Sequence, residues 1–180
     1  MPKERLRPMQ IIVFALLQSL LFFALIAAFI AANSGPRPAL PVSDEVLRYA
    51  LLGITGLCVV LSLVIPRWQV KSAIDRIAAG TWRAHPHITQ LYGDQDGDDA
   101  KLASVYQSQL IVGCALLEAP AAAGAVLTLA TGSLEPLIVT AILFGLMLLR
   151  FPLSGTVSHW LDAQRGRIEA RRLELPGARS

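Results

Sequence analysis

The stretch KERLRPMQIIVFALLQSLLFFALIAAFIAA, residues 3–32, decides the fold, because three basic residues precede an unbroken run of 22 mostly apolar residues, Ile11–Ala32. A hydrocarbon core about 30 Å thick takes roughly 20 residues of helix at about 1.5 Å rise per residue. This run is therefore long enough to cross a bilayer. The 180-residue chain is 54% hydrophobic and only 16% charged, whereas a soluble domain averages about 25% charged residues. We expect lipid, not water, to solvate most of it.

Three further hydrophobic runs follow, and together the four predict an all-α integral membrane protein with four transmembrane helices. The expected spans are about 11–32, 46–65, 107–130 and 134–151. The last span is the shortest, and we expect Phe151 and Leu153 to lengthen it while the guanidinium of Arg150 reaches the headgroups. The transmembrane domain is expected over residues 1–153, with a cytoplasmic loop at 66–103, and a cytoplasmic basic tail is expected over 154–180.

Positive charge is distributed unequally around these spans. Fourteen of the sixteen Lys and Arg residues lie before the first span, between the second and third, or at and after the fourth. Arg37 and Arg48 are the two exceptions. Short loops rich in Lys and Arg stay in the cytoplasm, so both termini are expected there, which in a bacterium means the plasma (inner) membrane. The first run exceeds the about 7–15 apolar residues of a signal peptide, and we expect an uncleaved anchor.

Two polar segments have the periodicity of amphipathic helices. Val70, Ile74 and Ile77 share one face of residues 68–79, which predicts a short interfacial helix that ends at Gly80. The tail has an apolar stripe within about 100° of arc. Its members are Val157, Trp160, Leu161, Ile168 and Leu175.

Four arginines flank the stripe of the tail: Arg165, Arg167, Arg171 and Arg172. This layout is typical of a helix that rests among anionic lipid headgroups, so these four residues are expected to bind headgroups. A solvated helix and a partner-binding coil are the alternatives, because the same residues nearly fit a heptad seam.

One carboxylate lies inside a predicted span. An ionised Glu118 in mid-span would cost about 2.5–3.5 kcal/mol, so we expect it to be protonated or paired. Pro120 has no amide hydrogen for the Leu116 carbonyl, which leaves an acceptor beside the carboxylate. Depth along the spans predicts Gln18 as the preferred donor and Thr55 as a second neighbour. Two interpretations stay open, a proton- or cation-binding site and a neutral side chain that fixes helix packing.

The run LLEAPAAAG, Leu116–Gly124, resembles the carboxylate-bearing helix of rotary ATP synthase proteolipid subunits, in which small residues follow a membrane carboxylate. The resemblance covers nine residues, and the glycine-rich helix that accompanies that helix in the family does not precede it here. What the resemblance implies is ion binding at Glu118. In the same run, Ala115, Ala119 and Ala123 recur every four residues and favour close helix packing, which predicts a homo-oligomer or another membrane-protein partner.

Other motifs are weak. The acidic run GDQDGDD has no Glu at the twelfth position of a calcium loop. His85 and His87 have no Cys nearby, and Cys58 and Cys114 form neither a CxxC pair nor a disulfide framework. We expect no metal and no cofactor. We also expect no nucleic acid partner, because membrane orientation explains the positive charge. The expected function is a non-enzymatic assembly, accessory or structural component; the alternative is a proton- or cation-coupled transporter or channel subunit built on Glu118. A membrane enzyme ranks third.

Overall fold

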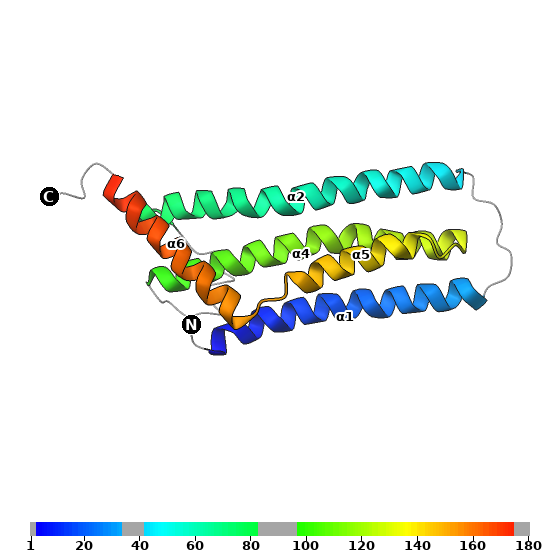
Figure 1. The fold of residues 1–180 in the computed structure, drawn as a ribbon, viewed down its shortest axis with the longest axis horizontal. Helices are drawn as coiled ribbons and strands as arrows, with labels where there is room; N and C mark the ends of the chain where they lie inside the picture. The colour runs from blue at the N-terminus through cyan, green and yellow to red at the C-terminus, as the bar shows by residue number, and fades with distance from the viewer. Residues whose placement is uncertain (1–2, 34–41, 83–96, 175–180) are drawn as a thin grey trace. The chain divides into compact units, whose positions relative to one another are not determined.

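The computed structural model describes residues 3–33, 42–82 and 97–174, and every regular element in these ranges is a helix (Figure 1). The helices are α1 (Lys3–Asn33), α2 (Asp44–Ala78), α4 (Asp98–Thr131), α5 (Pro136–Leu149) and α6 (Ser154–Glu174). Three of them, α1, α2 and α4, are long and apolar enough to cross a membrane. Counted together as one broken span, α5 and α6 pass the same test, which makes up to four spans. The prediction of an all-helical protein with helices long and apolar enough to cross a membrane is confirmed.

The structure of α2 differs from the prediction in one respect. A single helix of 35 residues contains both the expected span and the expected interfacial segment, with Pro66 inside it. The prediction of a separate interfacial helix is therefore wrong, because its residues form the last turns of α2. Gly80 ends the helix as expected: its φ is 71°, and its amide donates to the Ile77 carbonyl at 3.1 Å.

The hairpin from α4 to α5 has the expected turn chemistry. Gly132 has a φ of 72°, and its amide donates to the Thr128 carbonyl at 2.9 Å. Pro136 occupies the first turn of α5, where its missing amide hydrogen removes no helical bond. The 14 residues of α5 reach about 21 Å at about 1.5 Å each. The helix ends at Leu149. Phe151 was expected to extend it and does not.

Two compact units divide the chain. The bundle unit contains Ile11–Val64 and Val112–Phe151, and the α6 unit contains Met1–Gln10, Ile65–Ile111 and Pro152–Ser180. In the bundle unit α4 is central: 44% of its most apolar window is buried, against 22% in α1 and 17% in α2. The most deeply buried core side chains are at most 1% exposed, among them Val13, Leu117, Ala121, Leu143 and Met147. Large apolar side chains elsewhere on α1 and α2 point outward, as lipid solvation requires.

Close backbone packing joins α4 to α5. The Thr140 hydroxyl donates to the Ala121 carbonyl at 2.8 Å. A Cβ atom on Gly124 would lie 2.6 Å from the Thr140 hydroxyl oxygen and 2.9 Å from the Pro136 carbonyl oxygen. Since backbone cannot move aside as a flexible side chain can, only glycine fits at this position.

We expect Gly124→Ala to destabilise the hairpin by about 1–3 kcal/mol, the usual cost of overpacking a core. Gly145→Ala is the matched control, because nothing lies within 4 Å of a Cβ added there. Alanine at 145 should change stability by at most about 1 kcal/mol, in the stabilising direction. Unfolding of both variants in detergent micelles, followed by circular dichroism, checks the difference; equal midpoints for the two would contradict the close contact.

Candidate functional site

The carboxyl group of Glu118 lies where α4 meets α1 in the bundle unit. The Ser19 hydroxyl is 3.4 Å from a Glu118 carboxyl oxygen, and the Glu118 side chain is half-buried. Gln18, the expected donor, is exposed and makes no hydrogen bond within the described ranges. A helix turns about 100° per residue, so its two adjacent polar residues cannot both face Glu118. The hydroxyl oxygen of Thr55 is buried without a partner and is not bonded to Glu118.

Ser19 has one proton for two acceptors. Its hydroxyl lies 2.9 Å from the Leu16 carbonyl oxygen and 3.4 Å from Glu118. The shorter contact lies within the helix of Ser19, as hydroxyls inside helices commonly arrange. The longer one joins α1 to the Glu118 carboxyl group on α4.

Two prolines each leave one helical carbonyl without its usual amide partner. Pro120 is fully buried within α4 and frees the Leu116 carbonyl, as expected. Pro66 in α2 frees the carbonyl of Ser62. Arg150, at the end of α5, donates from Nη2 to both the Ser62 carbonyl and the Ser62 hydroxyl at 3.1 Å. The guanidinium therefore replaces the hydrogen bond that Pro66 cannot make, in addition to any contact with headgroups.

The second group of polar residues lies in the α6 unit, where amphipathic helices bury their apolar faces against each other. Val157, Leu161 and Ile168 on α6 are at most 5% exposed. On α2 the expected apolar face, Val70, Ile74 and Ile77, is buried as well. Both faces were expected to rest on the membrane, and the protein itself covers them instead. The reason is that α4 begins at Asp98, ahead of its apolar run, and its first turns supply the missing partner surface.

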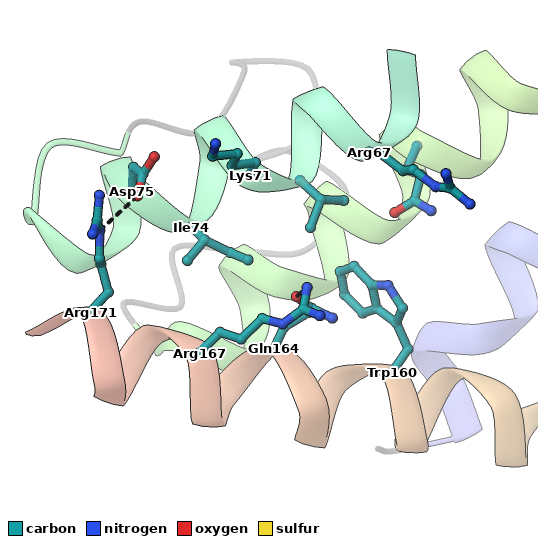
Figure 2. Close-up of a pocket in the computed structure, with 10 residues that line it drawn as sticks. Arg67, Lys71, Ile74, Asp75, Trp160, Gln164, Arg167 and Arg171 are labelled. Carbon is teal, nitrogen blue, oxygen red and sulfur yellow. Dashed lines mark hydrogen bonds and ion pairs between the residues drawn. The ribbon is translucent and has the colours of Figure 1, made fainter. Parts of the chain in front are cut away.

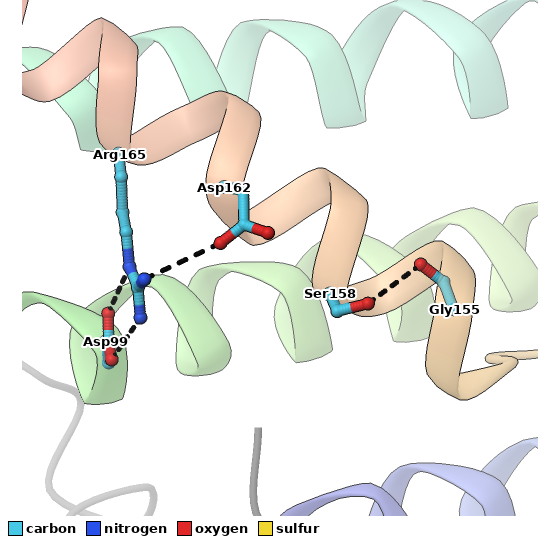
Figure 3. A network of polar contacts seen from close by, with 5 residues as sticks. All are labelled: Asp99, Gly155, Ser158, Asp162 and Arg165. Carbon is cyan, nitrogen blue, oxygen red and sulfur yellow. Dashed lines mark hydrogen bonds and ion pairs between the residues drawn. The ribbon is translucent and has the colours of Figure 1, made fainter.

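Ion pairs hold three of the four tail arginines. Arg165 Nε donates to Asp99 at 2.7 Å, Arg171 Nε pairs with Asp75 at 3.1 Å, and Arg172 Nη2 pairs with Asp98 at 2.9 Å. Arg165 also contacts Asp162 on its own helix, as Figure 3 shows. Arg167 differs from the other three, because its Nη1 donates to the neutral Gln164 Oε1 at 3.2 Å.

These contacts keep the paired guanidinium groups charged. The pKa of Arg165 is raised above its usual range, first by its hydrogen bonds to Asp99 and then by the negative charge of Asp99. The pKa of Arg171 is raised as well, first by its hydrogen bond to Glu174 and then by the charge of Asp75. A raised arginine pKa means that these two guanidinium groups stay charged up to the strongly alkaline range.

A basic pocket of about 530 Å³ opens beside these pairs (Figure 2). Trp160, Gln164 and Arg167 project into it from α6, and residues of α2 and α4 complete it. Its polar and charged lining residues are Arg67, Lys71, Asp75, Gln109, Gln164, Arg167 and Arg171. The Trp160 ring lies edge-on to Tyr106, with 5.0 Å between ring centroids and 62° between planes. This contact fixes one wall of the pocket.

Sequence reasoning found part of this pocket. Arg167 and Arg171 were expected to bind headgroups, and Trp160 was placed on the apolar stripe. Arg67 and Lys71 were counted only as topology signals, and Gln109 and Gln164 were not singled out. The available signal was the position of Arg67, two residues after the apolar run that ends at Ile65.

Comparison with protein-family models, curated proteins and solved structures finds no match to this chain. Within the described residues no group of three or more His, Cys, Asp or Glu side chains could hold a metal ion. His85, His87 and the first part of the acidic run lie outside those residues, as does Leu175 of the tail stripe. Ala115, Ala119 and Ala123 are exposed on α4, and the homo-oligomer stays a prediction.

We expect apolar burial, more than ion pairing, to hold α6 in place. Ile168 is 1% exposed, and its truncation to Ala should cost about 2–5 kcal/mol. The Arg165 and Asp99 side chains are 46% and 54% exposed, and an ion pair at that exposure contributes at most about 1 kcal/mol. Amide hydrogen exchange of α6 should therefore accelerate far more in Ile168→Ala than in Arg165→Gln. The reverse order would show that charge, not burial, docks the helix.

Proposed function

We propose that this chain is a non-enzymatic integral membrane protein with four spans and both termini in the cytoplasm, and that it acts as an assembly or accessory component. In this proposal the bundle unit anchors the protein, and the α6 unit binds anionic groups at the cytoplasmic membrane surface. The observation that carries it is the pre-formed basic pocket beside α6, a helix whose apolar face is buried and whose register the chain's own ion pairs set. A pocket whose walls are fixed before binding loses little conformational freedom on binding.

The proposed orientation is supported by the charges of the α6 unit. Tail arginines, together with Arg67 and Lys71, gather in one unit, and the rule for cytoplasmic loops assigns such clusters to the cytoplasm. Four spans require α5 to cross as a short helix. Its polar limits are Arg150 at one end and Glu135 at the other. Glu135 pairs with Arg48 at 2.7 Å. A local thinning of the bilayer accommodates a short span at modest cost.

Ion coupling through Glu118 is the second candidate, and its support is the half-buried carboxyl group near the carbonyl that Pro120 frees. Packing is favoured over it, since the Ser19 hydroxyl donates to the Glu118 carboxyl group and joins α1 to α4. A glutamine at 118 keeps an acceptor oxygen for the Ser19 hydroxyl and removes the carboxylate. The two candidates therefore differ in what this one substitution does.

We expect purified protein in proteoliposomes to show no proton or monovalent-cation flux that depends on Glu118. Glu118→Gln should insert, and its unfolding midpoint should stay close to that of the parent protein. Glu118→Ala should be less stable by about 0.5–1.5 kcal/mol, because the Ser19 hydroxyl loses its acceptor on α4. A pH-sensitive dye inside the vesicles measures the flux. The control is Ser133→Ala, purified and reconstituted in the same way. Flux present in the parent and abolished in Glu118→Gln would overturn the accessory role in favour of ion coupling.

A further inference from the structure

We propose that the basic pocket of the α6 unit binds a phosphate ester that also carries a free hydroxyl group. The headgroup of phosphatidylglycerol is one source of this chemistry, and a soluble glycerol or sugar phosphate is another. The inference rests on the proposed function, since it names the group that the cytoplasmic unit binds. Basic pockets beside membrane helices on the cytoplasmic side are typical binding places for anionic headgroups.

The charges of the pocket call for an anion. Its lining has four basic side chains and one acidic side chain, which leaves three net positive charges. Arg67 and Lys71 have no ion pair or hydrogen bond to any other described residue. Arg167 bonds only to the neutral Gln164. Like charges gathered in one pocket repel one another. A bound anion is attracted to each of them, and this attraction offsets the repulsion.

The roles of the four cations differ, and the difference favours phosphate. Arg171 is braced by Asp75 at 3.1 Å and Glu174 at 2.7 Å, so its guanidinium forms a fixed edge of the pocket. Arg67 and Arg167 keep nearly all of their N–H groups available. A guanidinium presents its donors in a planar fork that matches two oxygens of one phosphate. Lys71 adds a point charge without such a geometric requirement.

Two glutamines indicate the hydroxyl group. Gln164 lines the pocket and is only 5% exposed, and its Oε1 already accepts from Arg167, which leaves its amide N–H groups as the donors that it can offer a ligand. The Oε1 atom of Gln109 is buried and has no hydrogen-bond partner. A buried acceptor of this kind needs a donor. A phosphate diester has none, whereas a hydroxyl group on the same ligand supplies one.

Size and position are consistent with a lipid headgroup. The pocket volume of about 530 Å³ lies within the about 300–1,000 Å³ usual for small-ligand sites. Val70, Ile74 and Trp160 give it apolar walls, against which a glycerol backbone can pack. Arg67 comes two residues after the apolar run of α2, which is the level of the headgroups when α2 spans the bilayer. Tryptophan is enriched at the same level.

The experiment uses the full chain in nanodiscs of phosphatidylcholine with a small fraction of phosphatidylglycerol. Native mass spectrometry counts retained phosphatidylglycerol, and titration gives its affinity. We expect the double variant Arg67→Gln/Arg167→Gln to lose about tenfold or more in affinity, because two charge-assisted hydrogen bonds are removed. The matched control is Arg165→Gln/Arg172→Gln, which removes the same charge from ion pairs outside the pocket and should change the affinity less than about twofold. Hydrogen exchange of α6 verifies that the helix stays docked in both.

A second comparison tests the hydroxyl group with less risk to folding. Phosphatidylmethanol has the charge of phosphatidylglycerol and no hydroxyl group. The parent protein should prefer phosphatidylglycerol, and Gln109→Leu should abolish that preference. If both lipids bind the parent equally, the role of Gln109 is wrong.

The source of the phosphate is decided by adding glycerol 3-phosphate in solution, both to nanodiscs that contain phosphatidylglycerol and to nanodiscs of phosphatidylcholine alone. Phosphatidylglycerol binding that depends on Arg67 and Arg167, without competition from glycerol 3-phosphate, identifies a lipid site. Glycerol 3-phosphate binding with that same dependence identifies a soluble ligand. If neither probe distinguishes the pocket variant from the Arg165 and Arg172 control, the inference fails. Such a failure would also remove anion binding by the α6 unit from the proposed function, whereas the absence of ion coupling at Glu118 is tested separately by the flux experiment.

Discussion

The hydrogen bonds from Arg150 to Ser62 meet the main physical constraint on the bundle unit. In lipid every backbone polar group needs a partner inside the protein, and Pro66 deprives the Ser62 carbonyl of its own. The Arg150 guanidinium supplies that partner at 3.1 Å, on a helix that continues past the proline to Ala78. The same helix carries Arg67 and Lys71, which line the basic pocket of the α6 unit.

Burial and charge divide their roles in the α6 unit. Val157, Leu161 and Ile168 provide the docking free energy, because apolar burial outweighs ion pairs whose side chains are about half exposed. The ion pairs provide register instead, since Asp75, Asp98 and Asp99 each select one arginine of α6. Arg67, Lys71 and Arg167 have no acidic partner among the described residues, and all three line the pocket. Three of the four tail arginines are instead paired.

Helix identity could be predicted from the sequence where one physical effect dominates. The apolar runs, the left-handed Gly80 and Gly132, and Pro136 in a first turn all follow from local chemistry. The partner of the Ser62 carbonyl could not be predicted, because Arg150 lies 88 residues away along the chain. Ser19 was missed as the partner of Glu118 because depth counting ignores rotation about the helix axis. The tail pattern was found, but periodicity alone does not distinguish a face that meets lipid from a face that meets protein.

The account's central claim is that lipid solvates four helices and that the basic ends of the chain lie in the cytoplasm. Single cysteines at Ala39, Ser133 and Ser180, in a background of Cys58→Ala and Cys114→Ala, test it in intact cells with a membrane-impermeant maleimide. The account predicts labelling at positions 39 and 133 and none at 180 until the membrane is permeabilised. Labelling at 180 in intact cells would contradict it, because α5 would then not cross the membrane and the α6 unit could not lie as one body in the cytoplasm.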